Sequence, residues 1–455
     1  MSLKFGTDGV RGPADELTDE LVAALGQAAA SVFGTGRFVI GRDTRASGPR
    51  LAAALAAGIV AGGGGVESLG VVPTPLVALV AAQDGCAGAM VSASHNTWSD
   101  NGIKLFAPGG TKLSDAVEAE LEAKLAAVLA DGAIDLGGVA LAAAAAAAGE
   151  GDPFRVADAS AIKRYAAAVA GSLDGRRLDG VSVVIDCANG SASLVAAVVL
   201  RSLGAEVAVL HAEPDGRNIN AACGSTYPAD LQAAVVAVGA QVGLAFDGDA
   251  DRVLAVDEHG TLVDGDELIA ICTLDRHARG VLVDDAVVVT VMTNLGFRQS
   301  MERHGIEVVE TAVGDRYVLE ALAERKLSIG GEQSGHIIFP ALATTGDGLL
   351  SGVQVLDVLV RSGLTLSALA AAAMTRLPQV LHNVRVAERR PDVADLLADA
   401  IAAEEAVLAG TGRILVRPSG TEPLIRVMVE APDADQAEAI AARLAAAAVT
   451  ACGPA

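Results

Sequence analysis

Three aspartates at alternating positions, Asp247, Asp249 and Asp251, share one short glycine-bearing loop. Hard carboxylate oxygens at this spacing suit Mg²⁺, and three aspartates this close would repel one another without a cation. The sharpest alternative is a calcium loop of the EF-hand type, because Glu258 falls at its last ligand position. Arg252 stands where that loop needs glycine, which disfavours it. A solvated acidic turn is the other alternative, and the spacing favours a metal site.

A second candidate for chemistry is the stretch 89–108, where an apolar run ends in Ser-Ala-Ser-His-Asn. Ser94 falls where a strand is expected to become a loop, and His95 and Lys104 are close to it in sequence. Serine needs a neighbouring base or metal to become a good nucleophile, so this setting suits a nucleophilic hydroxyl. A plain turn explains the same composition, and the nucleophile is favoured only because other motifs supply matching parts.

Cations are few in this chain but are concentrated in turns. The formal net charge is −23, which argues against a nucleic-acid partner. A small anionic substrate remains compatible with that charge, provided that cations gather locally. The cations inside Gly/Ser/Asp-rich turns are Arg11, Arg42, Arg45, Lys104, Arg252, Arg316, Arg417 and Arg426.

Two of these turns have the composition of phosphate sites. Residues 5–12 combine three glycines with Arg11, so that exposed backbone N–H groups and one guanidinium could bind a phosphate. Residues 417–426 combine two arginines, two hydroxyls and a glycine, which suits a phosphate dianion. An ordinary turn is the alternative in both places, although it would not need both arginines of the second.

Residues 329–338 place Glu332, Ser334 and His336 in one glycine-rich loop after a short strand. Alternating polar groups of this kind could hold sugar hydroxyls, and His336 could move a proton near neutral pH. A capped turn would look similar, so this motif is weak in isolation.

The elements that position these loops follow a repeated strand–loop–helix order. A helix is expected from Thr18, its N-cap, to Val32, and another from Ser47 to Ala61. A buried strand within 37–45 breaks into a basic turn, and comparable strands are expected within 181–190 and 286–294. This order predicts an α/β fold with mixed, largely parallel sheets.

The 455 residues are too many for one core and predict about three or four domains. A low-complexity, alanine-rich stretch at 133–152 marks the first boundary. The expected domains are 1–150 with the Ser94 loop, 151–257 with the aspartates, 258–366 with the His336 loop, and 367–455. The last is expected to be a smaller α+β domain with the Arg417 loop.

Composition and cysteine usage predict a cytoplasmic protein. Hydrophobic residues make up 52% of the chain, yet no stretch is long and apolar enough for a membrane span, and the N-terminus lacks a secretory signal. The odd number of widely spaced cysteines predicts isolated thiols in a reducing compartment. They are Cys86, Cys187, Cys223, Cys272 and Cys452.

Taken together, five motifs resemble the α-D-phosphohexomutase superfamily, in its order, from Phe5 to about Glu430. They are Gly-Thr-Asp-Gly-Val-Arg-Gly, Ser-Ala-Ser-His-Asn, Asp-Gly-Asp-Ala-Asp-Arg, Gly-Glu-Gln-Ser-Gly-His and Arg-Pro-Ser-Gly-Thr-Glu-Pro. Gln333 and the sequence Gly314-Asp-Arg316 resemble the bacterial phosphoglucosamine mutase branch. Phosphoglucomutases and phosphomannomutases of the same superfamily are the alternative.

The resemblance implies four domains around one cleft and a set of site residues. The expected catalytic residues are Ser94, which carries a phosphate, with Arg11 and Lys104 beside it, and His336. One Mg²⁺ would be held by the Ser94 phosphate with Asp247, Asp249 and Asp251. Substrate would be bound by His95, Arg252, Arg316, Glu332 and Ser334, and its non-reacting phosphate by Arg417, Ser419, Gly420, Thr421 and Arg426.

The implied reaction interconverts glucosamine 6-phosphate and glucosamine 1-phosphate by two phosphoryl transfers. Phosphorylated Ser94 phosphorylates the sugar, the glucosamine 1,6-bisphosphate intermediate turns end for end, and Ser94 takes back the other phosphoryl group. Lys104 and His336 are both candidates for moving the hydroxyl proton. The product would feed UDP-N-acetylglucosamine and cell-wall precursor synthesis.

The implied partners are a small phosphosugar and either an activating kinase or autophosphorylation at Ser94, without nucleic acid or membrane. A homodimer is allowed by the resemblance. Two further classes of protein stay open at this point: a metal phosphatase, and a non-enzymatic protein that binds a metal or a sugar phosphate.

One departure from the family pattern follows Ser-His-Asn, where proline is usual and this chain has Thr97-Trp98. Loss of a fixed φ should loosen the loop unless the tryptophan packs it down. Trp98 is therefore expected to lean on the loop or to line the mouth of the cleft.

Overall fold

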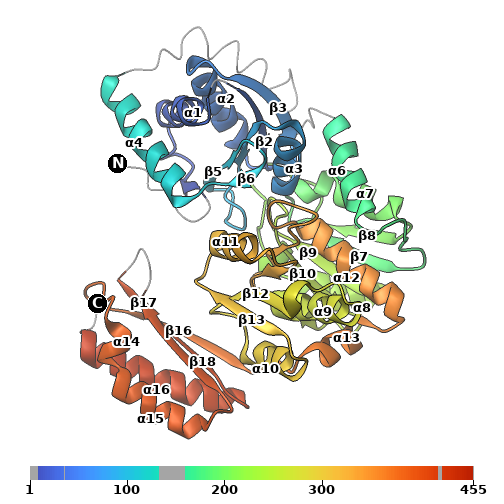
Figure 1. Ribbon diagram of the computed structural model, residues 1–455, viewed down its shortest axis with the longest axis vertical. Coiled ribbons are helices and arrows are strands. Elements are labelled where there is room, and N and C mark those ends of the chain that lie inside the picture. The colour runs from blue at the N-terminus through green and yellow to red at the C-terminus, as the bar shows by residue number, and fades with distance from the viewer. Residues whose placement is uncertain (1–8, 35, 133–158, 419–422, 454–455) are drawn as a thin grey trace. The chain divides into compact units, whose positions relative to one another are not determined.

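The computed structural model describes residues 9–34, 36–132, 159–418 and 423–453. The chain divides into two compact units, one of Met1–Met292 and Glu307–Ala371, the other of Thr293–Ile306 and Ala372–Ala455. Three sheets belong to the first unit and a fourth to the second (Figure 1).

The first sheet has the strand order β1-β5-β4-β2-β3, with β6 paired to β5. β2 is parallel to β3 and β4, whereas β5 is antiparallel to β1, β4 and β6. The strands are β1 Val10–Pro13, β2 Arg37–Arg42, β3 Gly65–Val71, β4 Ala87–Val91, β5 Asp100–Ala107 and β6 Thr111–Lys112. The helices are α1 Asp19–Phe33, α2 Gly48–Ala61, α3 Thr74–Asp84 and α4 Asp115–Asp131.

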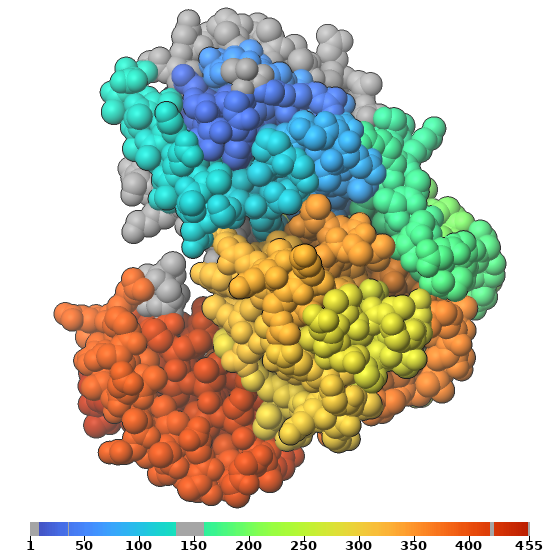
Figure 2. Space-filling view, viewed as in Figure 1, coloured from blue at the N-terminus to red at the C-terminus, as the bar shows by residue number. Residues whose placement is uncertain are grey.

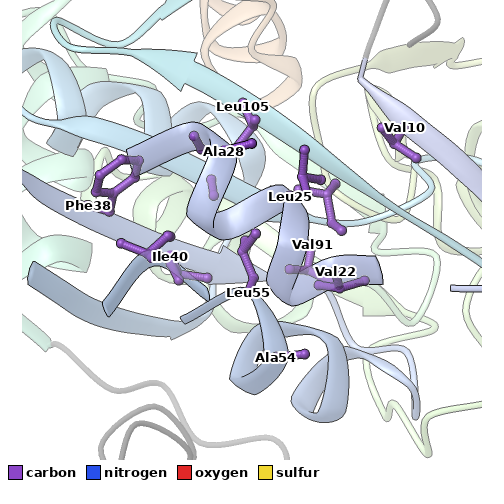
Figure 3. Packing of buried hydrophobic residues seen from close by; sticks show 14 of the residues in the cluster. Val10, Val22, Leu25, Ala28, Phe38, Ile40, Ala54, Leu55, Val91 and Leu105 are labelled. Atoms are coloured by element: carbon purple, nitrogen blue, oxygen red, sulfur yellow. The ribbon is translucent and has the colours of Figure 1, made fainter. Parts of the chain in front are cut away.

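Helix α1 begins where its sequence predicts. The Thr18 side chain accepts a hydrogen bond from the backbone N–H of Leu21, and acidic residues in the first turn complement the helix dipole. A Cβ on Gly58 of α2 would lie 1.9 Å from the Ala23 carbonyl oxygen of α1, so the two helices approach closely only because glycine is there. Buried side chains of α1, α2 and the sheet form one core, including Leu25, Phe38, Ile40, Leu55 and Val91 (Figure 3).

The second sheet has the order β11-β10-β9-β7-β8. β7 is parallel to β8 and β9, and β10 is antiparallel to β9 and β11. Its strands are β7 Ser182–Asp186, β8 Glu206–Leu210, β9 Val242–Phe246, β10 Val253–Asp257 and β11 Leu262–Val263. The helices are α6 Ala159–Gly171, η1 Ser191–Leu194, α7 Ala196–Ser202, η2 Gly224–Thr226 and α8 Ala229–Val238.

The third sheet has the order β13-β12-β14-β15. β12 is parallel to β13 and β14, and β15 is antiparallel to β14. Its strands are β12 Ala286–Thr290, β13 Glu307–Thr311, β14 Gly330–Gly331 and β15 Ile337–Ile338. The helices are α9 Gly265–Ala278, η3 Val283–Asp285, α11 Asp315–Arg325, α12 Gly348–Ser362 and α13 Leu366–Ala373.

These three sheets share one plan. In each, the first of three parallel strands lies in the middle, the other two flank it, and the chain then turns back in an antiparallel strand. The turn-back loops are β4–β5, β9–β10 and β14–β15. They carry the Ser94, aspartate and His336 motifs and are called here the serine loop (92–99), the aspartate loop (247–252) and the histidine loop (332–336).

The second unit contains a fully antiparallel sheet with the order β16-β18-β17. Its strands are β16 Gln379–Arg385, β17 Arg413–Pro418 and β18 Leu424–Glu430, and its helices are α10 Leu295–Arg303, α14 Val393–Leu396, α15 Ala398–Leu408 and α16 Ala434–Cys452. Asp433 caps α16 by accepting from the backbone N–H of Gln436. Buried residues of α16, including Ile440 and Leu444, pack on Val427 in the core of this unit.

The predicted α/β class, with mixed sheets and a smaller C-terminal α+β part, is confirmed. The exact domain limits 1–150, 151–257, 258–366 and 367–455 stay a prediction. Within the described part of the chain, no single helix has the length and apolar character to cross a bilayer. Helices α12 and α13 meet that criterion only as a pair, across a sharp bend.

Candidate active site

Ser94 lies in the serine loop, directly after the fully buried strand β4. Its residue surface is 0% exposed and its φ is 51°, a left-handed conformation that costs a non-glycine residue free energy. The Ser94 hydroxyl donates a 2.6 Å hydrogen bond to Oδ2 of Asp247 in the aspartate loop. The serine loop and the aspartate loop therefore meet at the serine hydroxyl. Both loops occupy the same position in their sheets, between the last parallel strand and the antiparallel strand.

The three aspartates form a buried carboxylate cluster. Asp247, Asp249 and Asp251 each offer an oxygen within 4.8 Å of the others. One oxygen of Asp249 and one of Asp251 are buried without a hydrogen-bond partner, which is costly unless a cation takes them. Oxygen-only donors and orphaned carboxylate oxygens fit a hard divalent cation such as Mg²⁺.

Charge within this cluster is partly balanced by Lys104 from β5. Its ammonium nitrogen lies 2.8 Å from Asp249 and 2.7 Å from Asp251. Burial followed by repulsion from the other two aspartates raises the pKa of Asp247 well above its usual range. Burial acts in the same direction on Asp251, but Lys104 and His336 hold the pKa of that carboxyl well below its usual range. Arg252, whose Nε lies 3.9 Å from Oδ1 of Asp251, is a second cation beside the three carboxylates.

His95 follows Ser94 and remains neutral at physiological pH. Burial, with the positive charges of Arg252 and Arg11, lowers the pKa of His95 to about 4. Arg252 donates to Nδ1 of His95 at 3.1 Å, and the same nitrogen lies 3.4 Å from the Ser94 hydroxyl oxygen. Nδ1 is therefore the unprotonated nitrogen, and its lone pair is bound by Arg252, while the Ser94 proton is donated to Asp247.

His336, in the histidine loop, completes the side of the site that faces the aspartates. Its Nε2 accepts from the backbone N–H of Gly346 at 3.2 Å, and its Nδ1 lies 3.7 Å from Oδ1 of Asp251. Although burial acts to lower the pKa of His336, its interaction with the nearby Asp251 carboxylate raises the pKa overall. The structure thus brings the buried imidazole of His336 next to the carboxylate cluster.

The other predicted residues of the first unit lie in varied settings. Arg11 is exposed and donates to Oδ1 of Asn96 at 3.5 Å. Glu332 accepts from the backbone N–H of Gly314 at 3.1 Å, and Ser334 is exposed in the same loop.

Arg316 at the start of α11 is ion-paired with Asp115 and Glu118 of helix α4. In Figure 2 the teal surface of the first α/β segment meets the gold surface that includes α11. Arg316, predicted to bind substrate, is 6% exposed in the structure, and its guanidinium is engaged by carboxylates.

Arg417 and Arg426 face each other in the second unit as register partners on β17 and β18. Burial and the charge of Arg426 lower the pKa of Arg417. Two like charges directly opposite on a sheet destabilise it, and an anion would relieve that repulsion. Ser419, Gly420 and Thr421, predicted for the same phosphate site, lie outside the described residues.

Two buried side chains that hold the serine loop were not assigned to the site from sequence. Arg45 was recognised only as one of the cations in turns, and its side chain is fully buried among backbone carbonyls of the serine loop. Asn220, from the connection between β8 and η2, contacts the same loop. No sequence signal marks Asn220, because its role depends on a contact across 126 positions of the chain.

Trp98 is 42% exposed, and the guanidinium carbon of Arg217 lies over its ring, 5.2 Å from the centroid. Trp98 belongs to the Thr97-Trp98 pair that stands where the family usually has proline. It stacks with an arginine from the connection between β8 and η2.

Comparison with known proteins gives four family matches along the chain. They are the phosphoglucomutase/phosphomannomutase α/β/α domain I at residues 2–130, domain II at 163–260, domain III at 264–377, and the C-terminal domain at 381–447.

Curated relatives match over almost their full length. A phosphoglucosamine mutase of Moorella thermoacetica is 51% identical, and the match covers 98% of this chain and 98% of the relative. A phosphoglucosamine mutase of Rhodococcus jostii is 50% identical, with 98% and 99% covered.

Solved structures share the fold. A phosphoglucomutase/phosphomannomutase family protein from Burkholderia thailandensis superposes with a TM-score of 0.76 at 23% identity, covering 98% of this chain and 97% of that one. The N-acetylphosphoglucosamine mutase of Aspergillus fumigatus, solved with GlcNAc-6P and magnesium, gives 0.71 at 21% identity, with 99% and 96% covered.

The family profiles span most of the chain, and the two relatives at 51% and 50% identity each match 98% of it. The resemblance drawn from the five sequence motifs is therefore confirmed. The chain belongs to the phosphoglucomutase/phosphomannomutase family and is a phosphohexomutase, an enzyme of the isomerase class.

Proposed function

We propose that this enzyme interconverts glucosamine 6-phosphate and glucosamine 1-phosphate, with Ser94 carrying the phosphoryl group between the two positions of the sugar. The single observation that carries the proposal is the 2.6 Å hydrogen bond from the Ser94 hydroxyl to Asp247, inside a buried cluster of three aspartates. The choice of the amino sugar rests on the relatives at 50 and 51% identity, which are phosphoglucosamine mutases.

Asp247, Asp249 and Asp251, with the phosphate on Ser94, would hold one Mg²⁺, whose chemistry here is to neutralise charge on a phosphoryl group. The chain's own cations add to that charge balance. Lys104 already bridges two of the aspartates, and Arg11 donates to Asn96 of the serine loop. These groups favour a transferring phosphoryl group, whose need is electrostatic stabilisation and alignment.

Proton movement at the sugar hydroxyl is assigned to His336 or Lys104. His336 has a raised pKa beside Asp251, so a buried imidazole can take a proton there. Lys104 is held by two carboxylates, which favours its charged form and a purely electrostatic role. Of the two, His336 suits the general base better.

Recognition of the sugar would use Glu332 and Ser334 for hydroxyl groups, with His95, Arg252 and Arg316 as further substrate-binding residues. Arg417 and Arg426, with Ser419, Gly420 and Thr421, would hold the phosphate that is not reacting. The 1,6-bisphosphate must turn over between the two transfers, so this second phosphate site has to accept both orientations of the sugar. Charge-based recognition by paired arginines suits that demand.

The same proposal includes the setting of the enzyme. The cysteines are free thiols, which fits the cytoplasm. Ser94 would first be phosphorylated by a kinase or by autophosphorylation. A homodimer is the proposed assembly, and the product would supply UDP-N-acetylglucosamine synthesis.

The decisive experiment measures turnover of glucosamine 6-phosphate with Mg²⁺, beside glucose and mannose phosphates, each primed with its 1,6-bisphosphate. We expect strong preference for the amino sugar, loss of turnover in Ser94→Ala, and retained turnover in Ser99→Ala, an exposed serine of the same loop. Preference for glucose or mannose would move the enzyme to another branch of the family. Release of inorganic phosphate without isomerisation would instead show a phosphatase.

A further inference from the structure

We propose that Asn220 is a positioning residue for Ser94: it holds the backbone of the serine loop so that the Ser94 hydroxyl faces the aspartate cluster. Its side-chain Nδ2 donates to the carbonyl oxygen of Ser94 and to that of Asn96, both at 2.8 Å. Asn220 is 2% exposed and so acts from behind the loop. The inference rests on the proposed role of Ser94.

The two carbonyl oxygens that Asn220 binds are also bound by Arg45. Its guanidinium donates to Ser94 and to Asn96, both at 2.9 Å. A carbonyl oxygen has two lone pairs, so each oxygen receives a full pair of donors, one from Arg45 and one from Asn220. This arrangement leaves neither carbonyl free to rotate towards the site, where its partial negative charge would oppose a phosphate.

Ser94 needs such an anchor because its backbone is strained. A left-handed conformation at a non-glycine residue costs on the order of 1 kcal/mol and persists only where the surroundings enforce it. The Ser94 backbone N–H is bound by the Ser92 hydroxyl at 2.9 Å, which holds one side of the residue. Arg45 and Asn220 hold the other side, at the carbonyl. Loss of one donor would let the peptide relax and swing the hydroxyl away from Asp247.

The segment that carries Asn220 is itself held firmly. The backbone N–H of Asn220 donates to the carbonyl of Ala188 at 2.9 Å. Four residues later, the backbone N–H of Gly224 donates at 2.9 Å to Asp186, a buried carboxylate at the end of β7. His211 lies 3.0 Å from the same carboxylate oxygen of Asp186. The second sheet therefore serves as the rigid support from which Asn220 reaches the serine loop.

Asn220 also touches the aspartate loop. A Cβ added to Gly248, between Asp247 and Asp249, would lie 2.7 Å from the Ser94 carbonyl oxygen and 2.8 Å from Nδ2 of Asn220. Gly248 thus packs closely against both the Ser94 carbonyl and the Asn220 amide, and no side chain would fit at this position. Asn220 sets the spacing between nucleophile and cluster, and this spacing governs the rate rather than the affinity for sugar.

The competing explanation is that Asn220 only joins two α/β segments. Thr44 provides a matched control, because its buried hydroxyl donates at 2.6 Å to the carbonyl of Asn189 and joins the same two segments. None of the contacts described for Thr44 reaches the serine loop. Thr44→Val should lower the melting temperature without changing the rate of phosphoryl transfer.

The test compares Asn220→Ala, Asn220→Asp and Thr44→Val by steady-state kinetics and thermal unfolding. For Asn220→Ala we expect kcat to fall about 10- to 100-fold, with KM for glucosamine 6-phosphate changed by less than about two-fold, because geometry and not binding is lost. Asn220→Asp has the same shape but no donor when ionised, so at about pH 8 its kcat should be lower still. As pH falls its protonated carboxyl regains one O–H donor, so its kcat relative to the wild type should rise. This pH-dependent recovery would be absent from the other two variants.

Equal loss of melting temperature in Asn220→Ala and Thr44→Val, with kcat unchanged in both, would overturn the proposal. A raised KM with unchanged kcat would overturn it as well. If the wild-type enzyme turns over none of the sugar phosphates, the proposed function fails. Hydrogen exchange then tests the positioning role, because amides of residues 95–98 should exchange faster in Asn220→Ala and remain protected in Thr44→Val.

Discussion

The Ser94 hydroxyl oxygen and Oδ2 of Asp247 are 2.6 Å apart although 153 positions separate them in the chain. Both atoms are buried, and Asp247 is crowded by two further carboxylates. A bound divalent cation would offset the repulsion among these three carboxylates.

Mg²⁺ should stabilise the protein, and the aspartates should be required for that effect. At a free Mg²⁺ concentration of 100 times its Kd, binding to the folded state alone adds about 2.7 kcal/mol, which should raise the melting temperature by a few degrees. Asp249→Asn should abolish this shift, because it removes a carboxylate with an orphaned oxygen. Asp174→Asn, which removes an exposed charge elsewhere, should keep it. An undiminished shift in Asp249→Asn would contradict the assignment of the metal site.

Inorganic phosphate should stabilise the C-terminal unit through Arg417 and Arg426. The two guanidinium groups face each other across β17 and β18, and a bound dianion would offset their repulsion. Arg417→Ala should raise KM about ten-fold or more, because each charge-assisted contact to a phosphate is worth on the order of 1.5–3 kcal/mol. Arg443→Ala, which removes an exposed arginine paired with Glu404 on the same unit, should leave KM unchanged. Kinetics and phosphate-dependent melting curves check both expectations.

Stability should depend on pH through Asp347, the N-cap of α12. Burial raises the pKa of Asp347 to about 6, even though Tyr165 donates to its carboxylate at 2.8 Å. The ordinary value of 3.8 applies to the unfolded chain. The folded state therefore holds the proton more tightly, and this contribution to stability is present at acidic pH and lost as pH rises through about 6.

The variant that isolates this effect is Asp347→Asn, which retains capping ability but cannot ionise. At about pH 7.5 its free energy of unfolding should exceed that of the wild type by up to about 3 kcal/mol, for a shift of about two pKa units, and its melting temperature should be higher. At about pH 5 the difference should fall to roughly half of that value, and it should vanish only below the unfolded pKa of 3.8. A pH-independent difference in melting temperature would show that Asp347 does not titrate in this range. Tyr165→Phe, in contrast, should destabilise by about 1–2 kcal/mol, because a buried acceptor loses its donor.

Arg316 should become more available to substrate when its partners on α4 are neutralised. Glu118 is partly buried and ion-paired with Arg316, so Glu118→Gln removes one of the two carboxylates that compete with a phosphosugar. If Arg316 binds substrate, KM should fall by about two- to five-fold in Glu118→Gln and rise in Arg316→Ala. Glu120→Gln, a neighbouring exposed position on α4, is the control. A higher KM in Glu118→Gln would indicate that the ion pair itself holds the productive conformation.

Sequence alone was sufficient for the local parts of this enzyme. The predicted helix after Thr18 begins at Asp19 with Thr18 as its cap, because capping depends on residues within one turn. The aspartates at alternating positions do form a cluster, since a short loop after a buried strand keeps their carboxylates together. The fold class followed from strand–loop–helix order and from motifs that are read along the chain.

The contacts between loops were decided only by tertiary structure. Arg316 was predicted to bind substrate, and only the fold shows it ion-paired with α4. Asn220 has an unremarkable sequence context, yet it holds the Ser94 carbonyl from another sheet. Residue spacing and periodicity report which face of a strand or helix is buried, whereas the packing of one sheet's loops against another's depends on the three-dimensional path of the whole chain. For this protein, the residue types within each loop determined which chemistry is available. The packing of three sheets with the same strand arrangement determined how those residues are placed relative to one another.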